Sequence, residues 1–140
     1  MTLSKEDKIN LSNSRMQKAA EFLRDAEANY NESRLKTSVN RSYYAALNAI
    51  RSLLILEDVN PESHEETITM LSLRFIKTEQ LPAAVVKKFK SLLGRRTDVD
   101  YGDFETIDTD DVKQSLADAD EIVHTIDSLR TTMIKELNTQ

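Results

Sequence analysis

The sequence predicts an all-α protein, an up-and-down helical bundle of about five helices. The 140 residues include only two glycines and two prolines, whereas average usage of about 7% and about 5% would give roughly ten and seven. An all-β sandwich or barrel needs a turn about every 8 to 12 residues, so this composition argues against one. Apolar residues recur instead at helical spacing, in long segments with short connections, which is typical of a bundle.

The first two helices are expected to be long. The first spans residues 4–30, because the hydroxyl of Ser4 can cap it, Asp7 follows three residues later, and apolar side chains then keep a helical period. The second spans residues 34–57, and Pro61 shortly after its end cannot continue a helix.

The later helices carry their own start signals. Ser63 and Glu66 form a capping-box pattern that opens the third helix. Pro82 suits the first position of the fourth helix, where the amide hydrogen that proline lacks would be unpaired. Asp108 or Thr109 can cap the last helix. These three helices are expected over residues 63–76, 82–99 and 108 onward, with a loop over residues 101–107.

Composition excludes several classes of protein. One domain is expected over residues 1–140 at this length. The absence of cysteine excludes a disulfide framework and thiolate metal sites. Neither Gly94 nor Gly102 belongs to a phosphate-binding loop motif. The chain starts with charged residues where a signal peptide is apolar, and its longest aliphatic run, Leu53 to Leu56, is far too short for a membrane span. We therefore expect a cytoplasmic protein with no membrane contact, metal or cofactor.

The net charge of −5 hides an uneven distribution. Residues 33–56 carry a net charge of +4 and residues 74–96 carry +6, whereas residues 97–111 carry −7. Two interpretations follow. The charges could balance within the fold as ordinary solvated faces, or the two basic helices could form a local surface that holds a polyanion.

The second helix has a polar row opposite its apolar face, which is expected to face the core and consists of Val39, Tyr43, Ala46, Leu47, Ile50, Leu53 and Leu54. Successive residues are about 100° apart around a helix, which places Arg41, Tyr44, Asn48 and Arg51 on one side. Arginine suits forked contacts with phosphate, and tyrosine can stack on a base. These four residues are candidates for binding RNA or a nucleotide. Alternatively, the row faces water or packs against a neighbouring helix.

A charged residue interrupts the apolar face of the fourth helix. Arg96 lies within the same arc as Phe89 and Leu92. A lone buried charge costs several kcal/mol, so it must be paired or placed at an opening. Asp100, four residues later, could pair with Arg96 within the helix. Alternatively, the apolar stripe opens there into a cleft or dimer interface, and Arg96 faces a ligand.

Two stretches resemble the HEPN superfamily. They are SVNRSYYAALNAIRSLLILE (Ser38–Glu57) and GRRTDVDYGDFETID (Gly94–Asp108), with a Ser63-His64 turn and KTEQLP (Lys77–Pro82) between them. The similarity is greatest to small free-standing members with an AYYA-like second helix. It implies an HEPN-like up-and-down bundle, commonly a homodimer. Many members are metal-independent endoribonucleases in toxin–antitoxin or defence modules, often encoded beside a minimal nucleotidyltransferase.

The family's catalytic signature is an arginine, usually followed by a polar residue and then, a few residues later, by a histidine. Carried over, these positions fall on Arg96 and Thr97, but the window from Asp100 to Gly102 holds no histidine. Tyr101 is the nearest analogue of a tyrosine that the partner transferase can nucleotidylylate in some members. RNA cleavage needs a base for the 2′-hydroxyl, for which Asp100 is the candidate, and Arg96 would stabilise the phosphorane. The resemblance thus makes Arg96, Asp100 and Tyr101 catalytic candidates and Thr97 a binding candidate.

The two histidines lie outside this motif. His64 suits helix-start chemistry, and His124 lies beside the apolar stripe of the last helix, where a structural or surface role is expected. Two histidines far apart support a metal site only weakly. Three hypotheses stay open: a nuclease acting as toxin or defence effector, a non-catalytic nucleotide-binding module without the catalytic histidine, and a structural dimerisation bundle.

Overall fold

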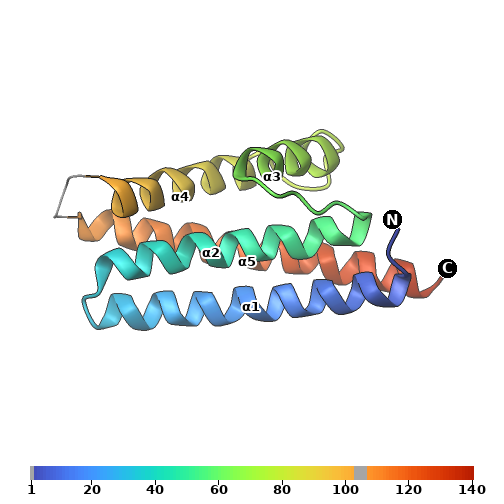
Figure 1. The fold of residues 1–140 in the computed structure, drawn as a ribbon, viewed down its shortest axis with the longest axis horizontal. Coiled ribbons are helices and arrows are strands. Elements are labelled where there is room, and N and C mark those ends of the chain that lie inside the picture. The colour runs from blue at the N-terminus through green and yellow to red at the C-terminus, as the bar shows by residue number, and fades with distance from the viewer. Residues whose placement is uncertain (1, 103–106) are drawn as a thin grey trace.

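The computed structural model describes residues 2–102 and 107–140, and all regular structure in this part of the chain is helical. The predicted all-α bundle of five helices is confirmed (Figure 1). The helices are α1 (Lys5–Asn31), α2 (Leu35–Leu54), α3 (His64–Leu71), α4 (Ala84–Tyr101) and α5 (Thr109–Asn138), with a short 3-10 helix, η1 (Ile55–Glu57), after α2 and a π-helical turn, η2 (Ser72–Ile76), after α3.

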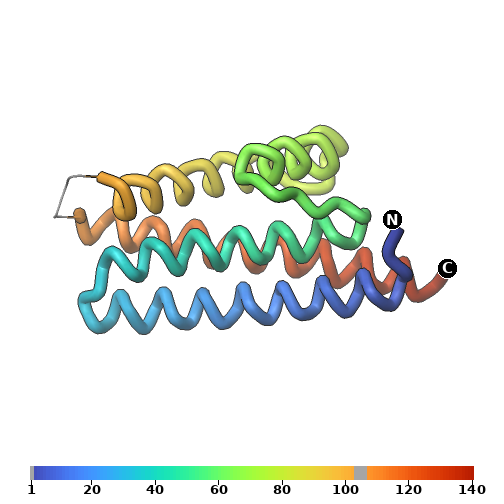
Figure 2. The backbone as a smooth tube through the Cα atoms, in the orientation of Figure 1, coloured from blue at the N-terminus to red at the C-terminus, as the bar shows by residue number. Residues whose placement is uncertain are grey.

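Helix α2 is the central helix of the bundle. It packs against α1, α4, α5 and α3, and α4 and α1 each also pack against α5. Figure 2 shows α1 and α2 running antiparallel through a tight turn, while the short α3 lies at the end of the bundle where both termini are found. Residues from four neighbouring helices can therefore contact α2.

The predicted apolar face of α2 forms much of the core. Six of its members are buried and Leu47 is half-buried. The opposite polar row, however, is not an open face, because Asn48 is only 8% exposed and Tyr44 is half-buried. A helix with neighbours on several sides has no single side that faces water. The six buried members are Val39, Tyr43, Ala46, Ile50, Leu53 and Leu54.

The predicted N-terminal caps of three helices are confirmed. The Ser4 hydroxyl accepts a hydrogen bond from the amide of Asp7 at 3.0 Å. The Ser63 hydroxyl accepts one from the amide of Glu66 at 3.1 Å. Side-chain oxygens at these positions satisfy amides that have no partner within the helix. The Asp108 carboxylate caps α5 in the same way, accepting from the amide of Asp110 at 2.8 Å.

The predicted bounds of the fourth helix are wrong at both ends. Helix α4 begins at Ala84, and Pro82 lies in the preceding turn, where its carbonyl accepts a hydrogen bond from the amide of Val85 at 3.1 Å. The helix also continues past Val99 to Tyr101. Tyr101 is therefore helical and not in the expected loop, most of which, residues 103–106, lies outside the described residues.

Candidate functional site

Arg96 on α4 is held among aromatic rings where α4 meets α2. Its guanidinium carbon lies 5.6 Å from the ring centroids of both Tyr43 and Tyr44 on α2, and 5.8 Å from that of Tyr101. Nη2 donates a hydrogen bond to the Tyr44 hydroxyl at 3.1 Å, and the side chain is only 15% exposed. Cation–π contacts of this kind stabilise a guanidinium that has lost most of its water.

The intrahelical pairing of Arg96 with Asp100 is confirmed. Nε of Arg96 lies 2.9 Å from Oδ2 of Asp100. Its N–H does not point along this line, so the contact is an ion pair without a hydrogen bond, and the buried Nε–H has no acceptor among the described residues. Burial opposes the charge of Arg96, but Tyr44, Asp100 and Tyr101 outweigh it and raise the pKa of Arg96. The arginine therefore stays charged.

A polar network continues from Asp100 onto α2 and α1. Asn40 Nδ2 donates to Oδ2 of Asp100 at 3.4 Å. Arg41 Nη1 donates to Oδ1 of Asn40 at 3.0 Å, and Arg41 Nε contacts Oδ2 of Asp25 on α1 at 2.9 Å. Arg41, a predicted binding residue, thus reaches the Arg96 cluster only through Asn40.

The structure brings some predicted site residues together and separates others. Arg96, Asp100, Tyr101 and Tyr44 form one cluster, and Tyr101 is 74% exposed, so the cluster reaches the surface. The other predicted residues lie apart from it. Thr97 donates a hydrogen bond to the carbonyl of Leu93 on its own helix, and Asn48 donates one to the carbonyl of Tyr44. Arg51 lines a pocket between the end of α2 and the start of α3.

Three further residues contact this cluster and are not among the predicted site residues: Tyr43, Asn40 and Phe22. Tyr43 was assigned to the core, where it is indeed fully buried and stacks on Phe89 at 5.5 Å. Burial raises the pKa of Tyr43, and the charge of Arg96 offsets only part of this rise. A signal for Tyr43 was present in the sequence, because the apolar face of α2 and the apolar face of α4 that carries Arg96 both face the core of the bundle. Phe22 on α1 packs beside Tyr44, with ring centroids 5.9 Å apart, and no sequence signal pointed to it.

Ion pairs neutralise much of the basic charge of residues 74–96. Besides Arg96, Arg95 pairs with Asp118 at 3.2 Å and Lys88 pairs with Glu121, both acids being on α5. Arg74 lies 3.6 Å from Glu57. On much of α4, the charges therefore balance within the fold. A polyanion would meet fewer unpaired cations there than the net charge of residues 74–96 indicates.

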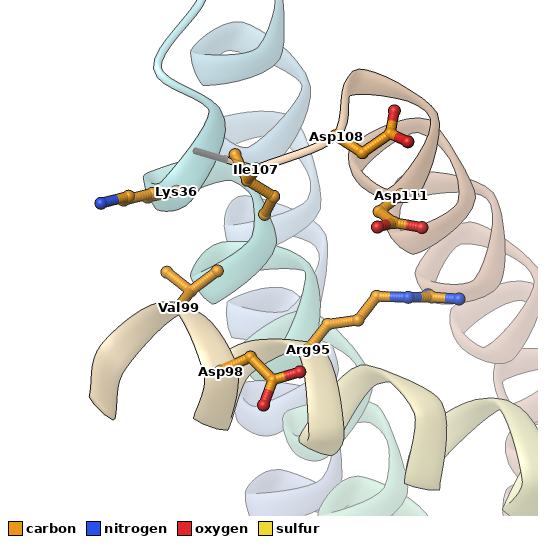
Figure 3. Close-up of a pocket in the computed structure, with 7 residues that line it drawn as sticks. All are labelled: Lys36, Arg95, Asp98, Val99, Ile107, Asp108 and Asp111. Atoms are coloured by element: carbon orange, nitrogen blue, oxygen red, sulfur yellow. The ribbon is translucent and has the colours of Figure 1, made fainter. Parts of the chain in front are cut away.

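A pocket of about 540 Å³ lies between the C-terminal end of α4, the start of α2 and the start of α5 (Figure 3). In Figure 3, Arg95 extends towards α5, Asp111 comes from the first turn of that helix, and Asp108 precedes it as its N-terminal cap. Among the described residues its lining holds three carboxylates against two cations, and Arg95 is already paired with Asp118. This lining does not suit an anionic ligand.

The two histidines lie on different elements. His64 begins α3, and its Nδ1 shares a hydrogen bond with the Tyr43 hydroxyl. His124 is exposed on α5 beside Asp120, at 3.2 Å. Within residues 2–102 and 107–140, no group of three or more His, Asp or Glu side chains is placed to hold a metal ion. None of the helices described is both long and apolar enough to span a bilayer.

The chain is similar to known proteins over most of its length. A curated relative from Thermotoga maritima, a "UPF0332 protein", is 26% identical over 80% of this chain and 85% of its own. The "Putative toxin MJ0142" of Methanocaldococcus jannaschii is 28% identical over 61% of this chain, and the match spans only 58% of that protein. The crystal structure of TT1696 from Thermus thermophilus shares the fold, with a TM-score of 0.71 and 15% identity over 84% of this chain and 97% of that one. A model of the HEPN domain matches residues 12–129, and the chain therefore belongs to the HEPN family.

Proposed function

We propose that this chain binds RNA or a nucleotide at the Arg96 cluster, as the HEPN component of a toxin–antitoxin or defence module. One observation carries the proposal: a charged guanidinium that three aromatic rings hold in place, beside an exposed tyrosine. Phosphate oxygens are the natural acceptors for such a donor. The exposed ring of Tyr101 can stack on a base. The toxin named among the relatives supports the type of module.

Two versions of this function differ in whether RNA is cleaved. In the catalytic version, Asp100 takes the proton of a 2′-hydroxyl, whose oxygen attacks the adjacent phosphorus. Arg96 binds the oxygens of the phosphorane, and the departing 5′-oxygen takes a proton from water, which leaves a 2′,3′-cyclic phosphate. In the non-catalytic version, the cluster binds the nucleotide without turnover. The second version is favoured by the contacts of Asp100, whose carboxylate already engages Arg96 and Asn40.

Binding and cleavage can be measured on the same variants. Arg96→Gln removes the guanidinium, and Asp100→Asn removes only the proposed base. Lys90→Gln is the matched control, since it makes the same charge change at an exposed position on the same helix. We expect Arg96→Gln to weaken binding of a fluorescent RNA at least about tenfold, because hydrogen bonds to charged groups are the strong ones. Lys90→Gln should bind like the wild type.

Incubation of labelled RNA with a chelator present separates the two versions. Products with 2′,3′-cyclic ends that Asp100→Asn fails to form support catalysis, whereas binding without products supports the non-catalytic version. If the wild type binds neither RNA nor any nucleotide tested, the proposal is wrong.

Assembly and cellular role belong to the same proposal. We expect a cytoplasmic homodimer that acts with a minimal nucleotidyltransferase, and Tyr101 is exposed enough for modification by it. Light scattering should give twice the mass of one chain. Expression without the partner should slow growth if the protein is a toxin, and Arg96→Gln should restore growth.

A further inference from the structure

Two neighbouring arginines differ from the other half-buried arginines of this chain. Six half-buried arginines lie in the described residues, and four of them pair with a carboxylate. Arg15 and Arg51 are the exceptions, with no carboxylate within ion-pair distance in the ranges 2–102 and 107–140. The paired residues are Arg41 with Asp25, Arg95 with Asp118, Arg96 with Asp100, and Arg130 with Asp127.

Arg15 contacts the backbone of Arg51 and the side chain of Asn60. Nη1 of Arg15 donates to the main-chain carbonyl of Arg51 at 3.3 Å, and Nη2 donates to Oδ1 of Asn60 at 3.1 Å. Burial and the charge of Arg51 lower the pKa of Arg15. Nε of Arg51 is buried and has no acceptor among the described residues. Like charges at partly buried positions without a counter-ion are unfavourable, and an anion between them would remove this cost.

Arg51 opens into a pocket of about 280 Å³ between the end of α2 and the start of α3. The side chains of Asn60 and His64 also line it, together with the exposed Glu62. The α3 N-terminus itself is already capped by Ser63, so an anion here would depend on side chains for its contacts.

His64 presents one ring nitrogen to a ligand. Its Nδ1 is engaged by the hydroxyl of Tyr43. Because burial raises the pKa of Tyr43, that phenol keeps its proton at neutral pH and can donate to Nδ1. Nε2 then carries the hydrogen of the neutral ring, and it has no partner in the part of the chain that the structure describes.

We propose that Arg51 and His64, with the charge of Arg15 beside Arg51, form a phosphate-binding site at the junction of α1, α2 and α3. The guanidinium of Arg51 contacts the phosphate oxygens, Arg15 adds a second positive charge beside it, and His64 donates from Nε2. Tyr43 separates this site from the Arg96 cluster, since its hydroxyl contacts His64 while its ring faces Arg96. The site does not require that Arg96 act on RNA, and its chemistry suits free phosphate, a nucleotide or the RNA backbone.

The chain contains an internal reference for testing this site, because it has only two histidines. Inorganic phosphate is titrated into the protein at constant ionic strength, and the histidine ring resonances are followed by NMR. We expect the His64 resonance to shift saturably while that of the exposed His124 stays nearly constant. Equal, unsaturable shifts of both would overturn the proposal.

Variants assign the binding to the two arginines. Arg51→Gln should weaken phosphate binding at least about tenfold, whereas Arg24→Gln, the same change at an exposed position of α1, should not. If Arg51→Gln fails to fold, the phosphate affinity of Arg15→Gln is measured in its place. Unchanged affinity in the folded variant contradicts the site.

Two further arms identify the source of the phosphate and separate the two proposals. Tighter binding of adenosine monophosphate or of a short RNA than of phosphate assigns the site to a nucleotide, and equal binding assigns it to free phosphate. Arg96→Gln should keep the His64 shift with phosphate even where it loses RNA binding. The two sites can therefore fail independently.

Discussion

Replacing Tyr43 by phenylalanine removes one hydroxyl from the centre of the molecule and leaves the ring in place. That hydroxyl shares a hydrogen bond with Nδ1 of His64, while the ring stacks on Phe89 and faces Arg96. Tyr43→Phe therefore tests the link between the core of α2 and the start of α3 without disturbing the aromatic packing around Arg96.

The expected loss of stability at neutral pH is about 1 kcal/mol, since a typical hydrogen bond contributes about 0.5 to 1.5 kcal/mol net. Water can replace the phenol at Nδ1, because His64 is half-buried and not fully enclosed. The full penalty of an unsatisfied buried nitrogen is therefore avoided. With a slope of about 2 kcal/mol per molar urea, the unfolding midpoint should fall by about 0.5 M.

The same variant should behave differently in alkali. Burial raises the pKa of Tyr43 above its ordinary value of 10.0. Above that pH the unfolded chain loses the phenolic proton while the folded protein keeps it, so the wild type loses stability as the pH rises, by up to about 1.4 kcal/mol per pH unit. Tyr43→Phe has no such proton. The advantage of the wild type should vanish near about pH 11 and reverse above it.

Urea unfolding followed by circular dichroism at neutral pH and at about pH 10 to 11 measures both effects. Tyr30→Phe is the control, because Tyr30 is a half-buried tyrosine on α1 outside the site. Two results would contradict these expectations. A variant as stable as the wild type at neutral pH means that the hydroxyl contributes nothing, and parallel pH curves mean that Tyr43 ionises in the folded protein.

Two further predictions concern the packing and the N-terminal region. Phe89→Ala removes a fully buried ring that stacks on Tyr43 and should cost about 3 to 5 kcal/mol in urea unfolding; a loss below about 2 kcal/mol would show that the site collapses around the smaller residue. Lys8 and the amide of Leu3 hold the pKa of Asp58 below its ordinary value of 3.8. Asp58→Asn should therefore lower the urea midpoint near neutral pH, and its difference from the wild type should shrink as the pH falls below about 4. A difference that is constant with pH would contradict this.

Features set by neighbours in the sequence could be predicted from it. Ser63 caps the amide of Glu66 because the two lie one helical turn apart, and Arg96 meets Asp100 for the same reason. The buried face of α2 also follows from periodicity alone. In each case the geometry of a single helix decides which residues meet.

The candidate site could be predicted only in part. Arg41 and Arg51 lie in one row on α2, but ten residues of helix separate them by about 15 Å. They therefore meet different neighbours: Arg41 contacts Asp25 of α1, whereas Arg51 lines the pocket beside α3. A helical wheel shows the direction of each side chain around the helix axis but not its position along that axis.

The all-α class, the helix caps and the core faces follow from the sequence alone, because each depends on residues within one or two helical turns, whereas the pairing of Arg96 with Asp100 was one of two interpretations. Helix packing, in contrast, places the rings of Tyr43 and Tyr44 against Arg96, His64 at the hydroxyl of Tyr43, and Arg15 beside Arg51. These contacts join different helices, so they depend on how the helices pack against one another, which no local pattern specifies.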